Sequence, residues 1–264
     1  MRSHDAGECW ERNADGWTRL ARAGYDVYRD AFNTPAFLES LPDVKGLHGL
    51  DIGCGEGHNT RLVAERGARM SAVDIAPTFI RHAQAFEAYS PLGITYLVAD
   101  ACSLPFNAES FDFAVAFMSL MDIPTPDRAL GEALRVLRPG GFLQFSITHP
   151  CFDTPHRRNV RDEDGRTVAI EVGDYFDQEP GRLTRWLFSS APAEARRGIP
   201  DFEVPQFHRP LSCWVNDLCE TGFTIERINE PSPSDPVVAA WPAVQDAQVV
   251  AYFLHVRARK ARAA

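Results

Sequence analysis

The sequence has 264 residues, of which 45% are hydrophobic and 24% are charged, and its net charge is -9. This length suffices for one full α/β domain with an added cap or insertion, and the composition is that of a globular protein. The negative charge disfavours nonspecific binding to a phosphate backbone, so nucleic acid is a disfavoured partner. The apolar stretches are strand-sized, far short of the roughly 20 residues of a membrane span. The polar N-terminus has no apolar signal core, so we expect no membrane span and a cytoplasmic location.

The six cysteines are dispersed through the chain, at Cys9, Cys54, Cys102, Cys151, Cys213 and Cys219. None are spaced as CxxC, and no Cys/His cluster has the spacing of a zinc site. We therefore expect free thiols, no disulfide and no metal.

The N-terminal segment, residues 1–45, is expected to be a helical cap. Residues 8–45 read as helical, and Thr34-Pro35 restarts a short helix through Leu41. Aromatic residues recur along the segment, at Trp10, Trp17, Tyr25, Tyr28 and Phe32. Aromatic residues at helical spacing belong more often to a core than to a cofactor site, so the simplest interpretation is an amphipathic helix packed on the domain surface.

Strands and helices alternate through the next hundred residues. The expected strands are 49–52, 69–73, 94–99, 111–117 and 142–148. The expected helices are 60–66, 77–89 and 126–137, the last ended by Arg138-Pro139-Gly140-Gly141. This βαβα alternation favours a mainly parallel sheet with right-handed crossovers and an α/β fold.

Regularity breaks at His149-Pro150. Residues 151–210 are rich in Asp, Arg, Pro and Gly, and a stretch this long between sheet elements is usually a functional lid or insertion. The core, residues 46–150, is expected to resume over 211–256. There we predict a helix over 211–221 capped by Gly222, a strand over 223–228, a Pro-rich loop over 230–246, a final strand over 249–256 and a frayed tail.

The strongest local signal is the segment Leu50–Gly57, which follows a strand and precedes a helix. Its glycines allow positive φ and close approach of a ligand to the backbone. The candidate contacts within it are Asp51, Gly53, Cys54, Gly55 and Gly57. The pattern is G-x-G-x-G, and His58 stands where a dinucleotide site has its third glycine. The Asp51 carboxylate would repel a pyrophosphate but suits an ammonium and a sulfonium, which favours S-adenosylmethionine over NAD; a merely tight turn is the alternative.

Two further carboxylates end strands. Asp74 stands roughly 20 residues past the first glycine, where a carboxylate can accept both ribose hydroxyls, and Ile75 could flank the adenine. The alternative for Asp74 is the N-cap of the helix that begins at Pro77. Asp100 could accept the adenine amino group, and the Ala101 N–H could reach a ring nitrogen. The fourth strand ends near Met118, which brings its backbone close to the methionine end of the cofactor.

Together these segments resemble the class I S-adenosylmethionine-dependent methyltransferases, in particular the small-molecule branch similar to the ubiquinone/menaquinone-biosynthesis enzymes. The matching motifs are LDIGCGEG, AVDIA, VADACSLPF, SFDFAVAFMSLMD and EALRVLRPGGFLQFSI. They cover about residues 47–148, and the match resumes over 211–228.

The resemblance implies a Rossmann-like, doubly wound seven-stranded sheet with an antiparallel last strand and S-adenosylmethionine as methyl donor. It implies cofactor contacts from Asp51, Gly53, Gly55, Asp74 and Asp100. It names no nucleophile. The [N/D]-P-P-[Y/F] signature of enzymes that methylate exocyclic amines of nucleobases is absent, because Met118-Ser119-Leu120-Met121 stands at that position.

Acceptor residues are expected at the carboxyl ends of the fourth and fifth strands and in the lid. His149 is the preferred base, with a hydrogen-bonded turn residue as the alternative, and His208 is the second candidate. Asp122 is a candidate to orient a hydroxyl or amine, although a helix cap is the simpler interpretation. His58 is expected to be structural or a cofactor-side contact. In related enzymes the N-terminal helix closes over the cofactor, so Tyr25 or Tyr28 is expected to cover the donor.

Aromatic residues of the insertion could form an apolar wall for the acceptor or the insertion's own small core; they are Tyr175, Phe176, Trp186, Phe188, Phe202 and Phe207. The favoured function is methyl transfer to a small molecule. The alternatives are an RNA or protein methyltransferase, a non-catalytic relative that binds the cofactor or a partner protein, and an NAD enzyme. A monomer or a homodimer is expected.

Overall fold

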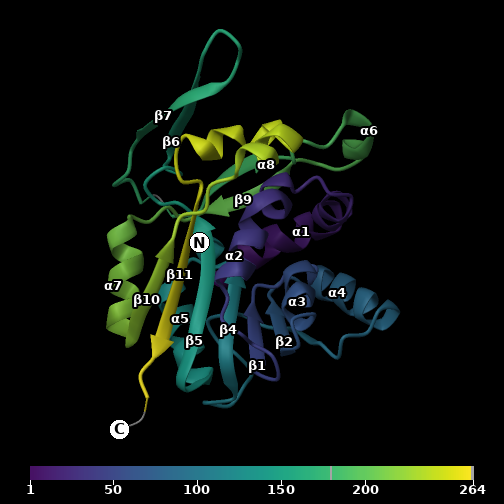
Figure 1. The fold of residues 1–264 in the computed structure, drawn as a ribbon. Coiled ribbons are helices and arrows are strands. Elements are labelled where there is room, and N and C mark those ends of the chain that lie inside the picture. Colours follow the sequence, from purple (N-terminus) through teal and green to yellow (C-terminus); the bar gives the residue numbers. More distant parts are fainter. Residues whose placement is uncertain (179, 263–264) are drawn as a thin grey trace.

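The computed structural model describes residues 1–178 and 180–262. At its centre lies a seven-stranded sheet in the order β10-β11-β5-β4-β1-β2-β3 (Figure 1). The strands are β1 (His48–Ile52), β2 (Arg69–Asp74), β3 (Thr95–Val98), β4 (Phe111–Phe117), β5 (Leu137–Thr148), β10 (Phe223–Asn229) and β11 (Phe253–Lys260). The last strand, β11, runs antiparallel to both its neighbours, and the other pairs are parallel. The predicted Rossmann-like sheet with an antiparallel last strand is confirmed.

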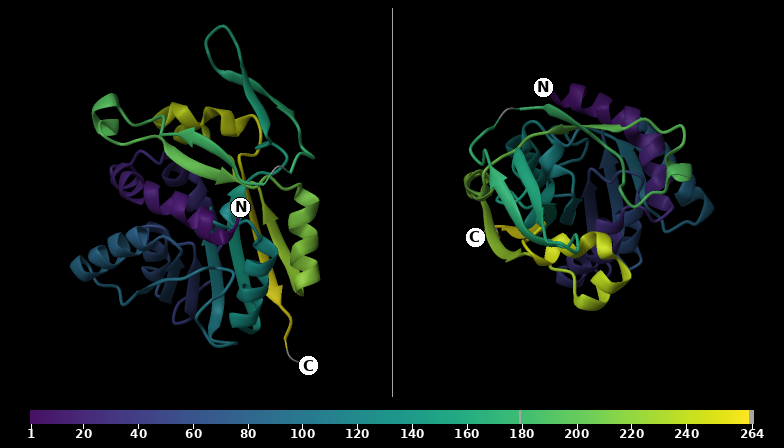
Figure 2. Two further views of the ribbon diagram at one scale, coloured as in Figure 1. Left: turned by 180° about the vertical axis from the view of Figure 1, so that it is seen from behind. Right: turned by 90° about the horizontal axis from the view of Figure 1, so that it is seen from above.

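Helices cover both faces of this sheet (Figure 2). They are α2 (Thr34–Ser40), α3 (His58–Ala64), α4 (Pro77–Tyr89), α5 (Pro126–Val136) and α7 (Leu211–Thr221). The alternation of β4 shows why both faces need covering. Phe113 and Val115 belong to the core formed with α2, α3 and α4, whereas Ala114 and Ala116 belong to the core formed with α5 and α7. Successive side chains of a strand point to opposite faces, so an uninterrupted apolar run requires two buried faces.

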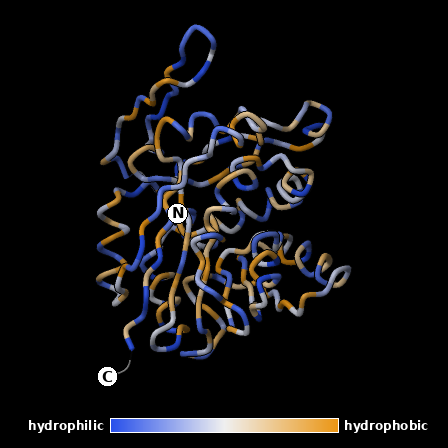
Figure 3. Tube along the Cα trace, viewed as in Figure 1, coloured by the Kyte–Doolittle hydropathy of each residue, from blue (hydrophilic) through white to orange (hydrophobic). Residues whose placement is uncertain are grey.

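A third layer lies over the carboxyl ends of the parallel strands, at the top of Figure 1. It contains α1 (Ser3–Arg22), the π-helix η1 (Arg29–Asn33), α8 (Asp235–Ala240) and the 3-10 helix η3 (Pro242–Gln248). The insertion adds the hairpin β6 (His156–Arg161)–β7 (Thr167–Gly173), the hairpin β8 (Arg182–Trp186)–β9 (Phe202–Gln206) and the short helix α6 (Ala193–Arg196). We call this layer the cap. The tip of β6–β7 projects away from the body and is hydrophilic (Figure 3).

Trp17 of α1 ties this helix to the insertion. Its ring packs against Trp186, Phe188 and Phe202, with centroid distances of 5.3, 4.8 and 5.1 Å. The Asn13 side chain also donates to the Glu203 carbonyl at 2.9 Å and accepts from the Glu203 N–H at 3.1 Å. Aromatic contacts of this kind stabilise beyond the area that they bury. The insertion and the N-terminal helix therefore share one small core.

Three sequence predictions need correction. The predicted loop 230–246 contains α8 and most of η3, because Ser234-Asp235-Pro236 starts a helix that no long apolar stripe announces. The last strand begins at Phe253 rather than 249 and continues to Lys260. The tail is not frayed up to that residue, since Lys260 Nζ donates to the carbonyls of Leu134 and Leu137. Residues 263–264 of the predicted tail lie outside the described residues.

The N-terminal segment is also less continuous than predicted. The first helix ends at Arg22, and Gly24 follows with a φ of +82°, a conformation that terminates helices. Gly222 ends α7 as predicted, with a φ of +105°. Within residues 1–178 and 180–262 no helix is long and apolar enough to cross a membrane. All six cysteines are free thiols in the structure.

Candidate active site

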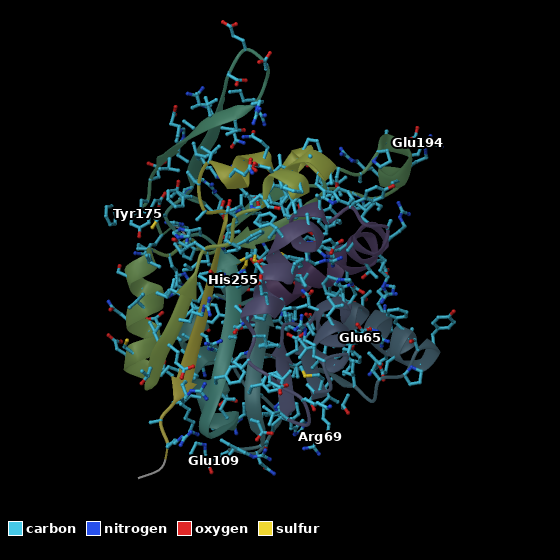
Figure 4. All side chains as sticks on the ribbon, viewed as in Figure 1. Glu65, Arg69, Glu109, Tyr175, Glu194 and His255 are labelled. Carbon is cyan, nitrogen blue, oxygen red and sulfur yellow. The ribbon has the colours of Figure 1, made fainter. Side chains whose placement is uncertain are left out.

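A cavity of about 550 Å³ lies between the carboxyl ends of the sheet strands and the cap. Figure 4 helps to locate it: Arg69 and Glu109, at the amino ends of β2 and β4, mark the opposite, lower edge of the sheet. The residues after β1, β2 and β3 line the part that we call the cofactor half. The segments after β4 and β5 and the insertion line the remainder, which we call the acceptor half. The carboxyl edge of an open α/β sheet is where ligands bind in this class of fold.

The glycine loop after β1 is fixed by backbone geometry. Gly53 and Gly55 have φ values of +75° and +55°, which favour glycine. The N–H groups of Gly53 and Cys54 both donate to the Val73 carbonyl at 2.8 and 2.9 Å, which fastens the loop to β2. A Cβ on Gly53 would lie 2.4 Å from the Ser119 Cβ, whereas a Cβ on Gly55 would meet nothing within 4 Å. Gly55 therefore leaves open space in the cavity wall. Gly57 lies outside that wall, and its Cβ would meet the Tyr96 hydroxyl at 2.7 Å.

Asp51 places an unpaired carboxylate oxygen at this loop. Its side chain is fully buried, and Oδ2 accepts from the Thr60 hydroxyl at 2.6 Å. Oδ1 is buried and has no hydrogen-bond partner among the described residues. Burial raises the pKa of Asp51 to about 7, and the charge of Asp74 adds to this. A buried polar atom without a partner costs about 1–3 kcal/mol. A ligand that brings an ammonium group would satisfy it.

Asp74 organises the loop from the neighbouring strand. Its Oδ2 accepts from the Gly55 N–H at 2.8 Å, and its Oδ1 accepts from the Ala76 N–H at 2.9 Å at the start of α4. Burial raises the pKa of Asp74 to about 6, although these backbone donors oppose the shift. The N-cap of α4 is Ala76 and not Asp74, so the alternative role of Asp74 as that N-cap is wrong. Asp74 lines the cavity. Each carboxylate oxygen accepts more than one hydrogen bond, so capacity for ribose hydroxyls remains.

The predicted adenine contacts lie together beneath α1. Ile75, Asp100 and Ala101 all line the cavity. The Asp100 Oδ1 accepts from the Cys102 N–H at 2.8 Å, which fixes the carboxylate after β3. A Cβ on Gly7 of α1 would lie 3.0 Å from the Ile75 side chain. The helix therefore packs against this end of the site at a distance that glycine permits.

The glycine loop is also tied to the N-terminal segment by charges that the sequence analysis missed. Glu56 is buried, and its Oε2 lies 2.8 Å from Arg22 Nε, while its Oε1 lies 3.7 Å from Arg29 Nη1. Asp26 lies 3.7 Å from the Arg29 Nε, and burial raises the pKa of Asp26 to about 6. Asp26, Arg29 and Glu56 line the cavity. Their signal in the sequence is weak, because charged residues usually face solvent.

The backbone is strained at Met118, the residue near which the sequence predicts the end of the fourth strand. Met118 has a φ of +53°, which is uncommon for a residue other than glycine and is found often at functional sites. The Ser119 hydroxyl donates to the Ile52 carbonyl at 2.5 Å, and this links the end of β4 to the glycine loop. Tyr25 and Tyr28 also line the cavity, and the Tyr28 hydroxyl donates to Asp246 Oδ1 at 2.6 Å.

The structure does not bring His149 into the cavity wall. The residue is 3% exposed, its Nε2 lies 2.8 Å from Glu230 Oε1, and its Nδ1 accepts from the Cys151 N–H at 3.2 Å. Its carbonyl accepts from the N–H groups of Phe152 and Asp153 at 3.0 and 2.8 Å. These contacts correspond to the alternative interpretation, a histidine that holds its own turn. Both ring nitrogens are therefore engaged within the protein, and neither is free to take a proton from a methyl acceptor.

His208 does line the cavity. Its Nε2 lies 2.8 Å from the Tyr175 carbonyl oxygen, which can only accept, so Nε2 carries a hydrogen. When the ring is neutral, Nδ1 therefore holds the lone pair. Among the insertion aromatics, Trp186, Phe188 and Phe207 line the cavity. Phe202 belongs instead to the buried core of the cap, and Phe176 is 81% exposed. Some of these aromatic residues therefore line the cavity, as expected of an apolar wall, and others belong to the insertion's own core.

The chain resembles known proteins in both sequence and fold. Residues 50–145 match the family described as "Methyltransferase domain". A solved S-adenosylmethionine-dependent methyltransferase from Mesorhizobium loti is 29% identical, covers 86% of this chain and 96% of its own, and has a TM-score of 0.69. The sequence over residues 50–145 and the fold as a whole thus resemble those of S-adenosylmethionine-dependent methyltransferases. The predicted resemblance to this family and the predicted fold are confirmed.

Two curated proteins that are similar to this chain are named O-methyltransferases. An O-methyltransferase of Penicillium expansum is 35% identical over 172 residues, covering 57% of this chain and 62% of its own length. A ubiquinone biosynthesis O-methyltransferase of Coxiella burnetii is 32% identical over 116 residues, covering 44% of this chain and 50% of its own. The chain thus covers less than two thirds of these relatives. The family match over residues 50–145 runs from β1 into β5.

The residues present fit S-adenosylmethionine. The unpaired Asp51 Oδ1 suits its ammonium group, the Asp74 carboxylate lies at the end of β2 for the ribose, and Gly55 leaves open space between them. Within the described ranges 1–178 and 180–262 no group of three His, Cys, Asp or Glu residues could hold a metal ion.

Proposed function

We propose that this protein transfers a methyl group from S-adenosylmethionine to a small-molecule acceptor. One observation carries the proposal: a single cavity is lined on one half by the glycine loop, Asp51 and Asp74, and on the other by aromatic residues of the insertion. Donor and acceptor can therefore lie side by side, shielded from bulk water. The volume of about 550 Å³ is within the range of small-molecule sites.

When bound, the cofactor supplies an activated sulfonium methyl group for in-line displacement. The protein then needs chiefly to align the acceptor and exclude water. Met118 and Ser119 place the end of β4 beside the glycine loop, and Trp186 and Phe207 wall the opposite half. His208 Nδ1 is the base that the geometry supports for an acceptor that must lose a proton. His149, the other predicted base, supports the turn after β5.

The cap is proposed to act as the lid of this site, with residues 1–45 over the cofactor half and 151–210 over the acceptor half. The ion pairs of Arg22 and Arg29 with Glu56 support the first assignment, and Trp186, Phe188 and Phe207 support the second. We place the protein in the cytoplasm. The six free thiols support a reducing compartment. A monomer or homodimer remains the prediction for its assembly.

Two glycines provide a matched test of the cofactor half. Gly55 and Gly93 have φ values of +55° and +77°, and a Cβ on either meets nothing within 4 Å, but only Gly55 lines the cavity. Gly55→Ala should weaken S-adenosylhomocysteine binding at least about tenfold in calorimetry, because the new methyl group occupies cofactor space. Gly93→Ala should bind like the wild type. Equal affinities for all three proteins would place the cofactor elsewhere.

The alternative functions predict different experimental results. Folded protein that binds S-adenosylhomocysteine but retains nucleic acid through purification would favour an RNA substrate. Binding without turnover across small-molecule acceptors would favour a non-catalytic relative. The cavity lining favours a small molecule, since Trp17, Trp186 and Phe207 form an enclosed apolar wall rather than a basic groove.

A further inference from the structure

Two carboxyl groups in the acceptor half have no protein partner. Asp122 and Asp153 both line the cavity, and neither side chain makes a hydrogen bond or ion pair with any other described residue. Both residues are half-buried. Burial, together with the neighbouring Asp153 charge, raises the pKa of Asp122 well above the usual range of an aspartate. Carboxyls that are partly removed from water are ordinarily paired. Their missing partner is therefore expected to be a ligand.

Both residues are held by the strands that end at the reaction site. Asp122 ends the 3-10 turn η2 (Leu120–Asp122) that follows β4, and its N–H donates to the Ser119 carbonyl at 3.1 Å. Asp153 lies in the turn after β5, where its N–H donates to the His149 carbonyl at 2.8 Å. Strands β4 and β5 are adjacent and parallel, with Phe117 opposite Ser146. The two carboxyls thus follow two adjacent strands and line the same cavity.

Among the described residues, no arginine or lysine forms an ion pair with either carboxyl, and the nearby Arg157 pairs with Asp246. The arginines among the described residues of the cavity wall are Arg29 and Arg209. Arg29 pairs with Asp26, Asp30 and Glu56 in the cofactor half. Arg209 donates to the Pro124 carbonyl at 3.1 Å and lies 3.7 Å from Asp217 Oδ2. An acidic acceptor would be repelled here, whereas a cationic one would satisfy both carboxyls.

Apolar residues line the acceptor half beside these two carboxyls. Met121 and Ile123 flank Asp122, and Trp214, Trp186 and Phe207 complete the wall. Such a surface suits a hydrocarbon or aromatic body of the acceptor. Aromatic rings also attract an ammonium group that lies over their faces.

We infer that the acceptor is an amine carried on an apolar or aromatic body, and that Asp122 and Asp153 bind its ammonium group. This inference rests on the proposed methyl transfer. The ammonium loses one proton to His208 Nδ1. The nitrogen lone pair then forms the N–CH₃ bond as the S–CH₃ bond breaks, and the electron pair of that bond stays on sulfur. The products are the N-methylated amine and S-adenosylhomocysteine.

The test uses matched probes on protein saturated with S-adenosylhomocysteine. Tryptamine and phenethylamine are compared with tryptophol, phenethyl alcohol and phenylacetate, which keep the ring and replace the amine. Binding is followed by calorimetry, and methyl transfer to the same probes is followed with labelled S-adenosylmethionine. We expect the amines to bind at least about tenfold more tightly than the alcohols, phenylacetate to bind most weakly, and only the amines to be methylated.

The variants are Asp122→Asn, Asp153→Asn and the double variant, with Asp201→Asn as control, since Asp201 is exposed and outside the cavity wall. The cavity variants should lose the preference for amines and keep S-adenosylhomocysteine affinity, which also reports correct folding. Protein that binds S-adenosylhomocysteine but prefers no amine, or keeps its preference in the double variant, would overturn the inference and leave the proposed function standing. Failure to bind S-adenosylhomocysteine would instead overturn the proposed function.

Discussion

The two halves of the cavity are built from different parts of the chain. The cofactor half takes most of its residues from the carboxyl ends of β1, β2 and β3 and the short segments that follow them, which are fixed by bonds such as that from the Gly53 N–H to the Val73 carbonyl. The N-terminal segment covers it. The acceptor half takes its residues from β4, β5, a distant hairpin and α7, brought together through side-chain packing. The difference teaches that a cofactor site can be local in sequence, whereas an acceptor site depends on tertiary contacts. Variants should therefore separate cofactor binding from turnover.

The largest expected effect is on turnover alone. His208→Gln should lower kcat with the best amine acceptor about a hundredfold, because a positioned base contributes about two to four orders of magnitude. Steady-state kinetics measure this, and S-adenosylhomocysteine affinity should not change. A variant with wild-type kcat would remove His208 from the proton transfer.

The next effect concerns cofactor binding. Asp51→Asn should weaken S-adenosylhomocysteine binding about 10- to 100-fold, because the buried oxygen without a protein partner no longer carries charge toward the ligand's ammonium. Thr60→Ser, which keeps the hydroxyl donor to Asp51, is the control and should bind normally. Calorimetry on both variants decides the matter. Unchanged affinity in Asp51→Asn would mean that the carboxylate faces no ligand.

A pH dependence follows from the same carboxylate. Burial raises the pKa of Asp51 to about 7, and binding an ammonium requires the ionised form. Affinity for S-adenosylhomocysteine should therefore fall about tenfold from pH 8 to pH 6, with proton release on binding below pH 7. In the unliganded protein the sign is reversed: the native carboxyl keeps its proton longer than the unfolded one, so Asp51 lowers stability as pH rises from about 4 to 7. Asp51→Asn should flatten both profiles.

The smallest effect concerns the turn after β5. His149→Leu should weaken amine binding about threefold, because the turn that carries Asp153 loses the bond from the Cys151 N–H to His149 Nδ1. His149→Asn places an oxygen near the position of Nδ1 and should restore most of the affinity, while S-adenosylhomocysteine binding stays constant in both. A loss of methyl transfer beyond a hundredfold in His149→Asn would instead make the ring itself a base.

Sequence alone predicted the sheet, the cofactor and the position of the glycine loop, because a glycine pattern and three strand-end carboxylates are readable at fixed spacing. It also placed Asp122 and His208 on the acceptor side. It did not place Asp153 or Asp26 in the cavity, and it favoured His149 over His208. The reason is physical: His149 and Asp153 share one turn, and only the tertiary path of that turn decides which side chain enters the cavity. The helix at 235–240 was not predicted, because its sequence has no long apolar stripe. Val237 and Val238 instead pack against the cluster that contains Val244 and Ala247 of η3.

The central claim is that the cavity over β1 and β2 binds the methyl donor. Titration calorimetry of the wild-type protein with S-adenosylhomocysteine tests it most directly, with NAD as the competing ligand. The account predicts saturable binding of one S-adenosylhomocysteine per chain and no binding of NAD. A folded sample that binds no S-adenosylhomocysteine, or that binds NAD in its place, would contradict it.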